Sequence, residues 1–241
     1  MARADMARHL LLRLEGPLMA FGGETIDSLG VIRDFPAQSM LTGLIANALG
    51  WRREESELHN QLQARMVFGA RLDREGARFT DFQTAELGKD DRGWTTSGQP
   101  EGRAGGDGTY KGQHLRYRDF HADAAVLVAL RLEPAEESPT LDDVAEALRR
   151  PFRPLFLGRK PCLPTAPLFS GWVEAPNVLT ALQTAAPLTG DAQSRVLWPV
   201  GEGELSGSRK TDLCDERNWA SGVHGGWRPV CEGRLSQEVG T

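Results

Sequence analysis

The strongest structural signal in the chain lies in residues 10–50, LLLRLEGPLMAFGGETIDSLGVIRDFPAQSMLTGLIANALG. The leucine run at its start, which Gly16 and Pro17 end, indicates a short buried strand. A glycine-rich loop follows. From Met40 onward, apolar residues recur at helical spacing, and Gly50 is placed to end the helix as a C-cap. The segment therefore predicts a strand, a loop and a helix.

The start of this predicted helix is aimed out of the glycine-rich loop. Gln38 and Ser39 lie in its first turn, where backbone N–H groups have no partner within the helix. Arg33 lies nearby in the sequence. A helix N-terminus beside a cation suits an anion such as a phosphate. Strand, loop and helix units without an anion site are also common, so the pattern leaves both interpretations open.

Three segments resemble a known family. LEGPLMAFG and FPAQSMLTGLIANALGW, residues 14–22 and 35–51, are similar to the N-terminal signature of the Cas-five family of the RAMP superfamily. RPLFLGRKPCLPTAPLF, residues 153–169, is similar to the later motif of that family. RDFHADAAVLVAL, residues 118–130, resembles the strand that follows the family's central insertion. Order and spacing agree over about residues 8–175, most closely with the branch found in type I-E CRISPR Cascade complexes.

Length and composition indicate a globular chain. It has 241 residues, of which 40% are hydrophobic and 25% charged, enough to bury a core in one large domain or two small ones. No apolar run is long enough to span a membrane, and residues 1–8 lack the apolar core of a signal peptide. We therefore expect a cytoplasmic protein without a membrane partner. The net charge of -5 argues that any RNA site is a local patch.

The three cysteines, Cys162, Cys214 and Cys231, are an odd number and match no zinc-binding spacing. A reduced, cytoplasmic protein fits them best. Cys214, His224 and Cys231 can be drawn as a metal site, but their intervals do not support it. We expect neither a metal nor any other cofactor.

The order of predicted elements indicates an α+β fold. After the first helix come a second helix and two strands, then a strand and a helix beyond a long insertion; they are expected at residues 54–63, 66–72, 78–82, 120–132 and 140–150. Thr140 is the expected N-cap of the last helix. This order, close to βαββ-β-α, predicts a ferredoxin-like or RRM-like sheet with helices on one face, as in RAMP domains.

The insertion from Glu86 to Gln113 contains many glycines and almost no aliphatic side chain. Such a segment is either disordered in isolation or functional, and it can become ordered on a partner. Its basic and aromatic residues suit single-stranded RNA, with Arg116 and Arg118 at its base. In the family, the equivalent insertion, here about residues 84–117, is a thumb-like hairpin that reaches the neighbouring backbone subunit. The present insertion is longer and richer in glycine.

The densest positive patch begins at the end of the last predicted helix of the first domain. Arg149, Arg150, Arg153, Arg159 and Lys160 occur there without an acid. Prolines and Gly158 shape a loop that can cradle phosphates, and with the motif match we favour RNA contact here; a solvated basic surface is the alternative interpretation.

A strand, a helix and a strand are then expected at residues 169–174, 176–183 and 195–200, followed by a polar tail beyond Gly201. Trp219 and Trp227 are expected to pack on the body. We therefore expect two domains. Residues 1–150 form a RAMP domain, and residues 151–241 carry the basic loop and a smaller β-rich subdomain.

The resemblance implies a non-catalytic subunit of a type I-E CRISPR Cascade surveillance complex, which binds and caps the 5′ handle of the CRISPR RNA (crRNA). Its partners would be this handle, the backbone subunit CasC and the large subunit CasA, with target DNA contacted indirectly through the complex. The expected RNA-binding residues are Arg33, Gln38, Ser39, Arg116, Arg118, Arg153, Arg159 and Lys160.

Two other functions stay open. Lys111, His114 and Tyr117 carry the groups needed for metal-independent cleavage of precursor crRNA. They lie in or beside a glycine-rich insertion without visible rigid support, and the resemblance assigns cutting in type I-E systems to a separate subunit, CasE. The other possibility is a protein-interaction module whose basic patch binds an acidic partner.

Overall fold

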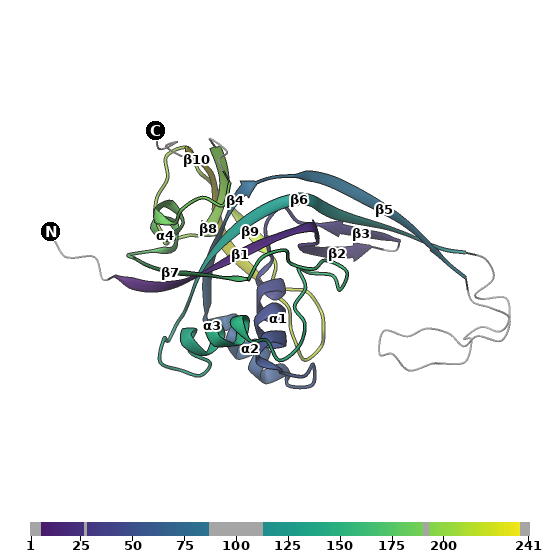
Figure 1. Ribbon diagram of the computed structural model, residues 1–241, viewed down its shortest axis with the longest axis horizontal. Coiled ribbons are helices and arrows are strands. Elements are labelled where there is room, and N and C mark those ends of the chain that lie inside the picture. The colour runs from purple at the N-terminus through teal and green to yellow at the C-terminus, as the bar shows by residue number, and fades with distance from the viewer. Residues whose placement is uncertain (1–5, 27, 87–112, 190–192, 237–241) are drawn as a thin grey trace.

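The computed structural model describes residues 6–26, 28–86, 113–189 and 193–236. The described residues form a curled sheet of ten strands, in which β2, β3, β6, β4, β8, β10 and β9 follow one another (Figure 1). Strands β1 and β5 also pair with β6, and β7 pairs with β1. The strands are β1 (Ala7–Met19), β2 (Gly22–Ile26), β3 (Leu29–Ile32), β4 (Met66–Arg74), β5 (Ala77–Ala85), β6 (His114–Leu132), β7 (Phe169–Ala175), β8 (Gln193–Pro199), β9 (Arg209–Cys214) and β10 (Trp227–Ser236).

Strand β6 is the centre of this sheet. Along residues 121–130 it pairs with β1, and along residues 125–132 its other edge pairs with β4. Its first half pairs with β5, from Ala77 opposite Ala122 to Ala85 opposite His114. We call this pair of strands, which projects from the body, the β5/β6 ribbon (Figure 1). The tight turn before it needs glycine, because a Cβ on Gly76 would lie 2.2 Å from the carbonyl oxygen of Ala122.

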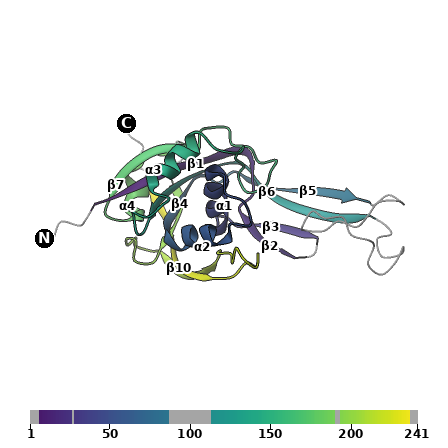
Figure 2. The ribbon, with the colours of Figure 1, turned by 90° about the horizontal axis from the view of Figure 1, so that it is seen from below.

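Helices cover both faces of the sheet. α1 (Gln38–Leu49), α2 (Ser56–Arg65) and α3 (Leu141–Arg149) lie on one face, and α4 (Val178–Thr184) lies on the other (Figures 1 and 2). Alternate residues of β6 enter two different cores: Val128 packs in the core with α1, and Leu127 packs in the core with α4. Burial on both faces explains the continuous apolar run in this strand. Of the described helices, none is both long and apolar enough to cross a membrane.

Two predicted helix ends are confirmed by their local geometry. Gly50 ends α1 in the left-handed conformation, with φ of 84°. Thr140 caps α3 by accepting a hydrogen bond from the Asp143 N–H, and the Asp143 carboxylate accepts one from the Thr140 N–H in return. Each of these helix ends depends on residues only a few positions apart, so the local sequence is enough to predict it.

The segment after Gly201 differs from the expected polar tail. It contains β9 and β10, which continue the sheet from β8. Strand β9 is an edge strand whose charged residues leave it mostly exposed, so it lacks the apolar alternation that marks a half-buried strand. Trp227 is 70% exposed, and the expectation that it packs on the body was wrong. Trp219 does pack, against α1 and α2.

Two buried histidines predict a fall in stability at acidic pH. Burial is the largest influence on His9 and His121 and lowers the pKa of each below its ordinary value of 6.5. As the pH drops below about 6.5, the unfolded chain binds protons that the folded protein excludes. The free energy of unfolding should therefore be highest above this pH and fall as the pH passes through the lowered folded values.

Urea unfolding between about pH 7.5 and about pH 5 measures this loss. The variant His121→Gln keeps a side-chain N–H for the Arg33 carbonyl, which His121 Nε2 contacts at 2.8 Å. Its stability should depend less on pH than that of the natural chain. An equal pH dependence in the two proteins would contradict the assignment to His121.

Candidate nucleic-acid interface

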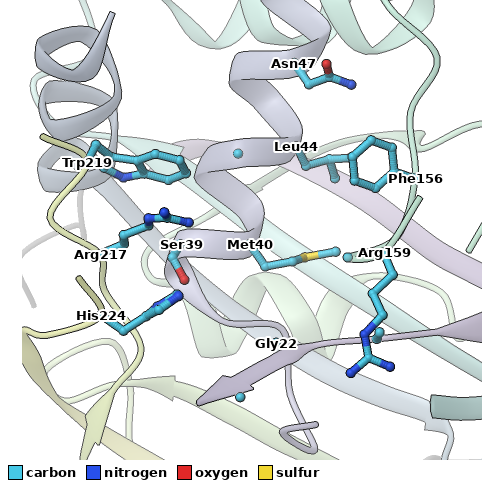
Figure 3. A pocket seen from close by; sticks show the side chains of 14 residues that line it. Gly22, Ser39, Met40, Leu44, Asn47, Phe156, Arg159, Arg217, Trp219 and His224 are labelled. Atoms are coloured by element: carbon cyan, nitrogen blue, oxygen red, sulfur yellow. The ribbon is translucent and has the colours of Figure 1, made fainter. Parts of the chain in front are cut away.

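A pocket of about 370 Å³ lies along α1 (Figure 3). One side of α1 forms its floor, between a wall from the loop after α3 and a wall from the segment between β9 and β10. Figure 3 shows Phe156 and Arg159 on one side of α1 and Arg217, Trp219 and His224 on the other. The full lining is Ala20, Gly22, Gly23, Ser39, Met40, Gly43, Leu44, Asn47, Phe156, Gly158, Arg159, Arg217, Trp219 and His224.

The lining suits an anionic ligand that also has flat apolar faces. Among the described residues that line the pocket, none is acidic, whereas Arg159, Arg217 and His224 are basic. Trp219 and Phe156 add aromatic rings. Cations bind phosphates and aromatic rings stack on unpaired bases, so this combination is typical of sites for single-stranded nucleic acid.

The N-terminus of α1 is closed by a carboxylate from the same chain. The N–H of Gln38 donates to Asp215 Oδ2 at 3.1 Å, and the N–H of Ser39 donates to the Asp215 carbonyl at 3.0 Å. Asp215 also accepts two hydrogen bonds of 2.9 Å from the Arg228 guanidinium. Of the two interpretations that the sequence left open, a phosphate on these two N–H groups is therefore excluded, because Asp215 already binds them.

The wall formed by Arg217 and Trp219 is fixed by Gln63 on α2. The Gln63 side-chain amide donates to the Arg217 carbonyl at 3.0 Å, and its oxygen accepts from the N–H of Arg217 and the indole N–H of Trp219, each at 3.1 Å. The Trp219 ring lies 4.6 Å from the ring of His59. It also packs against α1 at Gly43, where an added Cβ would lie 3.3 Å from the ring.

The opposite wall depends on Arg159. Its guanidinium donates to the carbonyls of Asp119 and Gly30, both at 2.8 Å, and lies 4.7 Å from the Phe120 ring. It thus fastens β3 beside β6. Burial, and to a smaller extent the charge of Arg118, lower the pKa of Arg159. Arg159 is therefore both a structural strap and part of the pocket lining.

The loop that carries Arg159 crosses the glycine-rich loop closely. Gly158 has φ of 91°, and a Cβ there would lie 1.7 Å from the carbonyl oxygen of Ala20. Only glycine can occupy this position without moving one of the two loops. The next residue but one, Lys160, is exposed to solvent.

Two other expected RNA-binding arginines hold backbone carbonyls. Arg33 donates to the Cys214 carbonyl at 2.6 Å. Arg153 donates to the carbonyls of Gly50 and Trp51, each at 2.9 Å, and so satisfies acceptors at the end of α1. Neither arginine lines the pocket.

The remaining expected residues are divided between the interior and the β5/β6 ribbon. Gln38 is buried, and its side-chain amide donates to the Gln63 carbonyl at 2.6 Å. Arg116 and Arg118 are exposed on β6. Of the eight expected residues, Ser39 and Arg159 line the pocket. Arg217 and His224 were not among the expected RNA-binding residues, because they lie in the segment that we read as a tail.

The residues considered for RNA cleavage do not converge on one point. His114 and Tyr117 are three positions apart on β6, opposite Ala85 and Phe82, so their side chains leave opposite faces of the ribbon. Lys111 lies outside the described residues.

The metal site considered at Cys214, His224 and Cys231 is not formed. Cys214 lies opposite Trp227, which is four positions along β10 from the buried Cys231. No set of three potential metal-binding residues is grouped within the part of the chain that the structure describes.

Comparison with known proteins identifies relatives of most of the chain. The model of the family CRISPR-associated protein (Cas_Cas5) matches residues 9–231. The CRISPR system Cascade subunit CasD of Escherichia coli (strain K12) is 30% identical over 196 residues, which cover 78% of this chain and 82% of CasD.

Two solved structures share the fold. A chain of a CRISPR RNA-guided surveillance complex has a TM-score of 0.70 and 25% identity, over 95% of this chain and 90% of that one. A crystal structure of a Cas protein has a TM-score of 0.63 and 26% identity, over 95% of both chains. The mixed α+β architecture with its curled sheet is therefore common to these proteins.

Replacing Asp215 tests how the pocket is held together. The variant Asp215→Ala should lower the free energy of unfolding by about 3–5 kcal/mol, because it leaves the Arg228 guanidinium and the first turn of α1 without their buried partner. Urea unfolding measures the change. The matched control is Asp212→Ala on the exposed edge of β9, which should change stability by about 0.5 kcal/mol or less. Equal effects of the two variants would contradict the role of Asp215.

Proposed function

Because the chain belongs to the Cas-five family of CRISPR-associated proteins, we propose that it is a non-catalytic subunit of a type I-E Cascade complex that binds and caps the 5′ handle of the crRNA. The pocket along α1 carries this proposal, since its described lining residues include three basic side chains and no acid. RNA phosphates supply the complementary charge, and unpaired bases of the handle supply flat faces for Trp219 and Phe156.

The exposed basic residues extend the proposed RNA path beyond the pocket. Lys160 follows the loop at the pocket wall, and Arg116 and Arg118 lie on the β5/β6 ribbon. Arg33, Gln38 and Arg153 act differently in this proposal, because they bind the protein backbone and, unlike Arg159, do not line the pocket. They shape the interface, and the RNA contacts come from Ser39, Arg159 and the exposed cations.

The β5/β6 ribbon is the proposed contact to the backbone subunit CasC. In this proposal the core is ferredoxin-like, and the ribbon is the base of the expected thumb-like insertion, about residues 84–117. Phe82, Leu115 and Tyr117 are 40% or more exposed, and the strand register places all three on one face of the ribbon. Such an exposed apolar face suits a protein partner. Contacts to the large subunit CasA and, through the complex, to target DNA complete the proposed role.

We place the cleavage of precursor crRNA in another subunit. A 2′-OH attack needs a proton acceptor and a charge-stabilising group converging on one phosphate. His114 and Tyr117 leave opposite faces of the ribbon, so they do not converge. The alternative, a metal-independent endoribonuclease, would need a different set of residues.

Co-expression with a CRISPR array and the products of neighbouring genes tests the proposed function. Purification through this chain should recover uniform crRNAs that share a repeat-derived 5′ handle. The triple variant Lys111→Ala, His114→Ala, Tyr117→Ala should still yield mature crRNA, as sequencing of the bound RNA would determine. Recovery of uncut precursor alone with the triple variant would make this chain the processing enzyme. Recovery of no specific RNA with the natural chain would reject the capping role.

A single exposed lysine tests the phosphate contact. Lys160→Ala should weaken handle binding and reduce the slope of log affinity against log salt concentration by about 0.7, the value for one phosphate contact to a single strand. Arg150→Ala is the matched control, because Arg150 is exposed and lies 3.6 Å from Glu146 in an ion pair. Fluorescence anisotropy at several salt concentrations measures both. An unchanged slope for Lys160→Ala would reject this contact.

A further inference from the structure

Two arginines from different segments converge beside the pocket. Arg217 lines the pocket, and Arg53 lies in the turn between α1 and α2. A Cβ placed on Gly222 would lie 3.1 Å from Nη2 of Arg217 and 3.8 Å from Nη2 of Arg53. Both guanidinium groups therefore reach the same small region. Within the described residues, neither forms an ion pair.

This arrangement is unfavourable without a further group. Burial of the Arg217 guanidinium lowers its pKa, and the positive charge of Arg53 lowers it further. Nε of Arg217 is buried and has no hydrogen-bond partner among the described residues. A buried donor without an acceptor destabilises a fold, and such donors are few in native proteins. An anion between the two guanidinium groups would relieve the repulsion and supply acceptors for their Nη groups.

The acidic residues next to the two arginines, Glu54 and Glu55 near Arg53 and Asp215 and Glu216 near Arg217, form no ion pair with either of them. Asp215 binds Arg228 and the first turn of α1. The Glu55 carboxylate accepts a hydrogen bond of 2.5 Å from the N–H of Arg52. Glu216 faces Gly226, where an added Cβ would lie 2.2 Å from its Oε2. These carboxylates do not neutralise the arginine pair, so a suitable anion has to come from a ligand.

The neighbouring side chain identifies the class of anion. The Arg217 guanidinium carbon lies 5.3 Å from the centre of the Trp219 ring, and both residues are on the same side of α1 (Figure 3). A flat indole next to two guanidinium groups offers a stacking surface beside a phosphate site. Guanidinium groups match phosphate oxygens with paired N–H donors, which a lysine does not. A nucleotide within a strand has both a phosphate and a base at this spacing.

We propose that Arg53 and Arg217 together hold one phosphate of the bound RNA, whose adjacent nucleotide occupies the pocket against Trp219. This assignment rests on the proposed RNA-binding function and adds a second phosphate site, on the wall opposite Arg159. It also gives a role to the segment between β9 and β10.

Backbone substitution in the RNA locates the phosphate. The probe is the crRNA recovered with this chain, synthesised with one uncharged methylphosphonate linkage at a time, and binding is measured with the full-length chain. One linkage should cost the natural chain about tenfold in affinity, the size expected for a charge-assisted hydrogen bond. The variant Arg53→Ala should bind unmodified RNA about tenfold more weakly than the natural chain does. Its affinity should not fall further when that linkage is made uncharged.

Arg52→Ala is the matched control, because Arg52 is the neighbouring exposed arginine. It should retain the linkage effect of the natural chain. Without RNA, Arg53→Ala should be at least as stable as the natural chain in urea, since it removes a repulsive charge; a purely structural role for Arg53 would lower stability instead. If each uncharged linkage lowers the RNA affinity of Arg53→Ala as much as that of the natural chain, the two-arginine site is rejected while RNA binding stands. If the natural chain binds no RNA, the proposed function is rejected as well.

Discussion

Backbone pairing along both edges of β6 is the constraint on which the architecture depends. One edge binds β1 and the other binds β4 and then β5, so a single strand passes from the buried body into the projecting ribbon. Burial on both faces follows from helices on either side of the sheet. Because α1 packs on one of these faces, the same strand also sets the position of the pocket floor relative to the ribbon. The body and the ribbon are thus built as one unit.

Much of this body could be predicted from the sequence, because its signals are local. Gly50 ends α1 and Thr140 begins α3 through contacts within a few residues. Strand β9 could not be predicted, since an edge strand exposed to water tolerates charged residues on both faces. Strand β10 pairs with β8 and β9 pairs with β10, so both strands extend the sheet already assembled around β6. The exposure of Trp227 could not be predicted either, because the sequence around an isolated aromatic residue does not show whether another segment covers it.

The candidate site could be predicted only in part. The glycine-rich loop, Ser39 and the Gly158-Arg159 turn all line the pocket, and each carried a recognisable motif. The sequence does not show which basic side chains donate hydrogen bonds to backbone carbonyls of the protein, as Arg153 does. The Asp215 cap was also hidden, since 177 residues separate it from Gln38. A motif identifies residue types near a site, whereas the partners of each side chain depend on contacts that are distant in sequence.

The Gln63 side chain has a consequence for the thermodynamics of binding. Its amide uses both its donor and its acceptor to hold the Arg217 and Trp219 segment before any ligand arrives. Ordering a flexible side chain on association costs about 0.5–1.5 kcal/mol, and a wall that is already ordered avoids much of this cost. More of the contact energy then appears as affinity. Preorganisation of this kind favours slow dissociation, which suits the proposed role of holding one RNA for a long time.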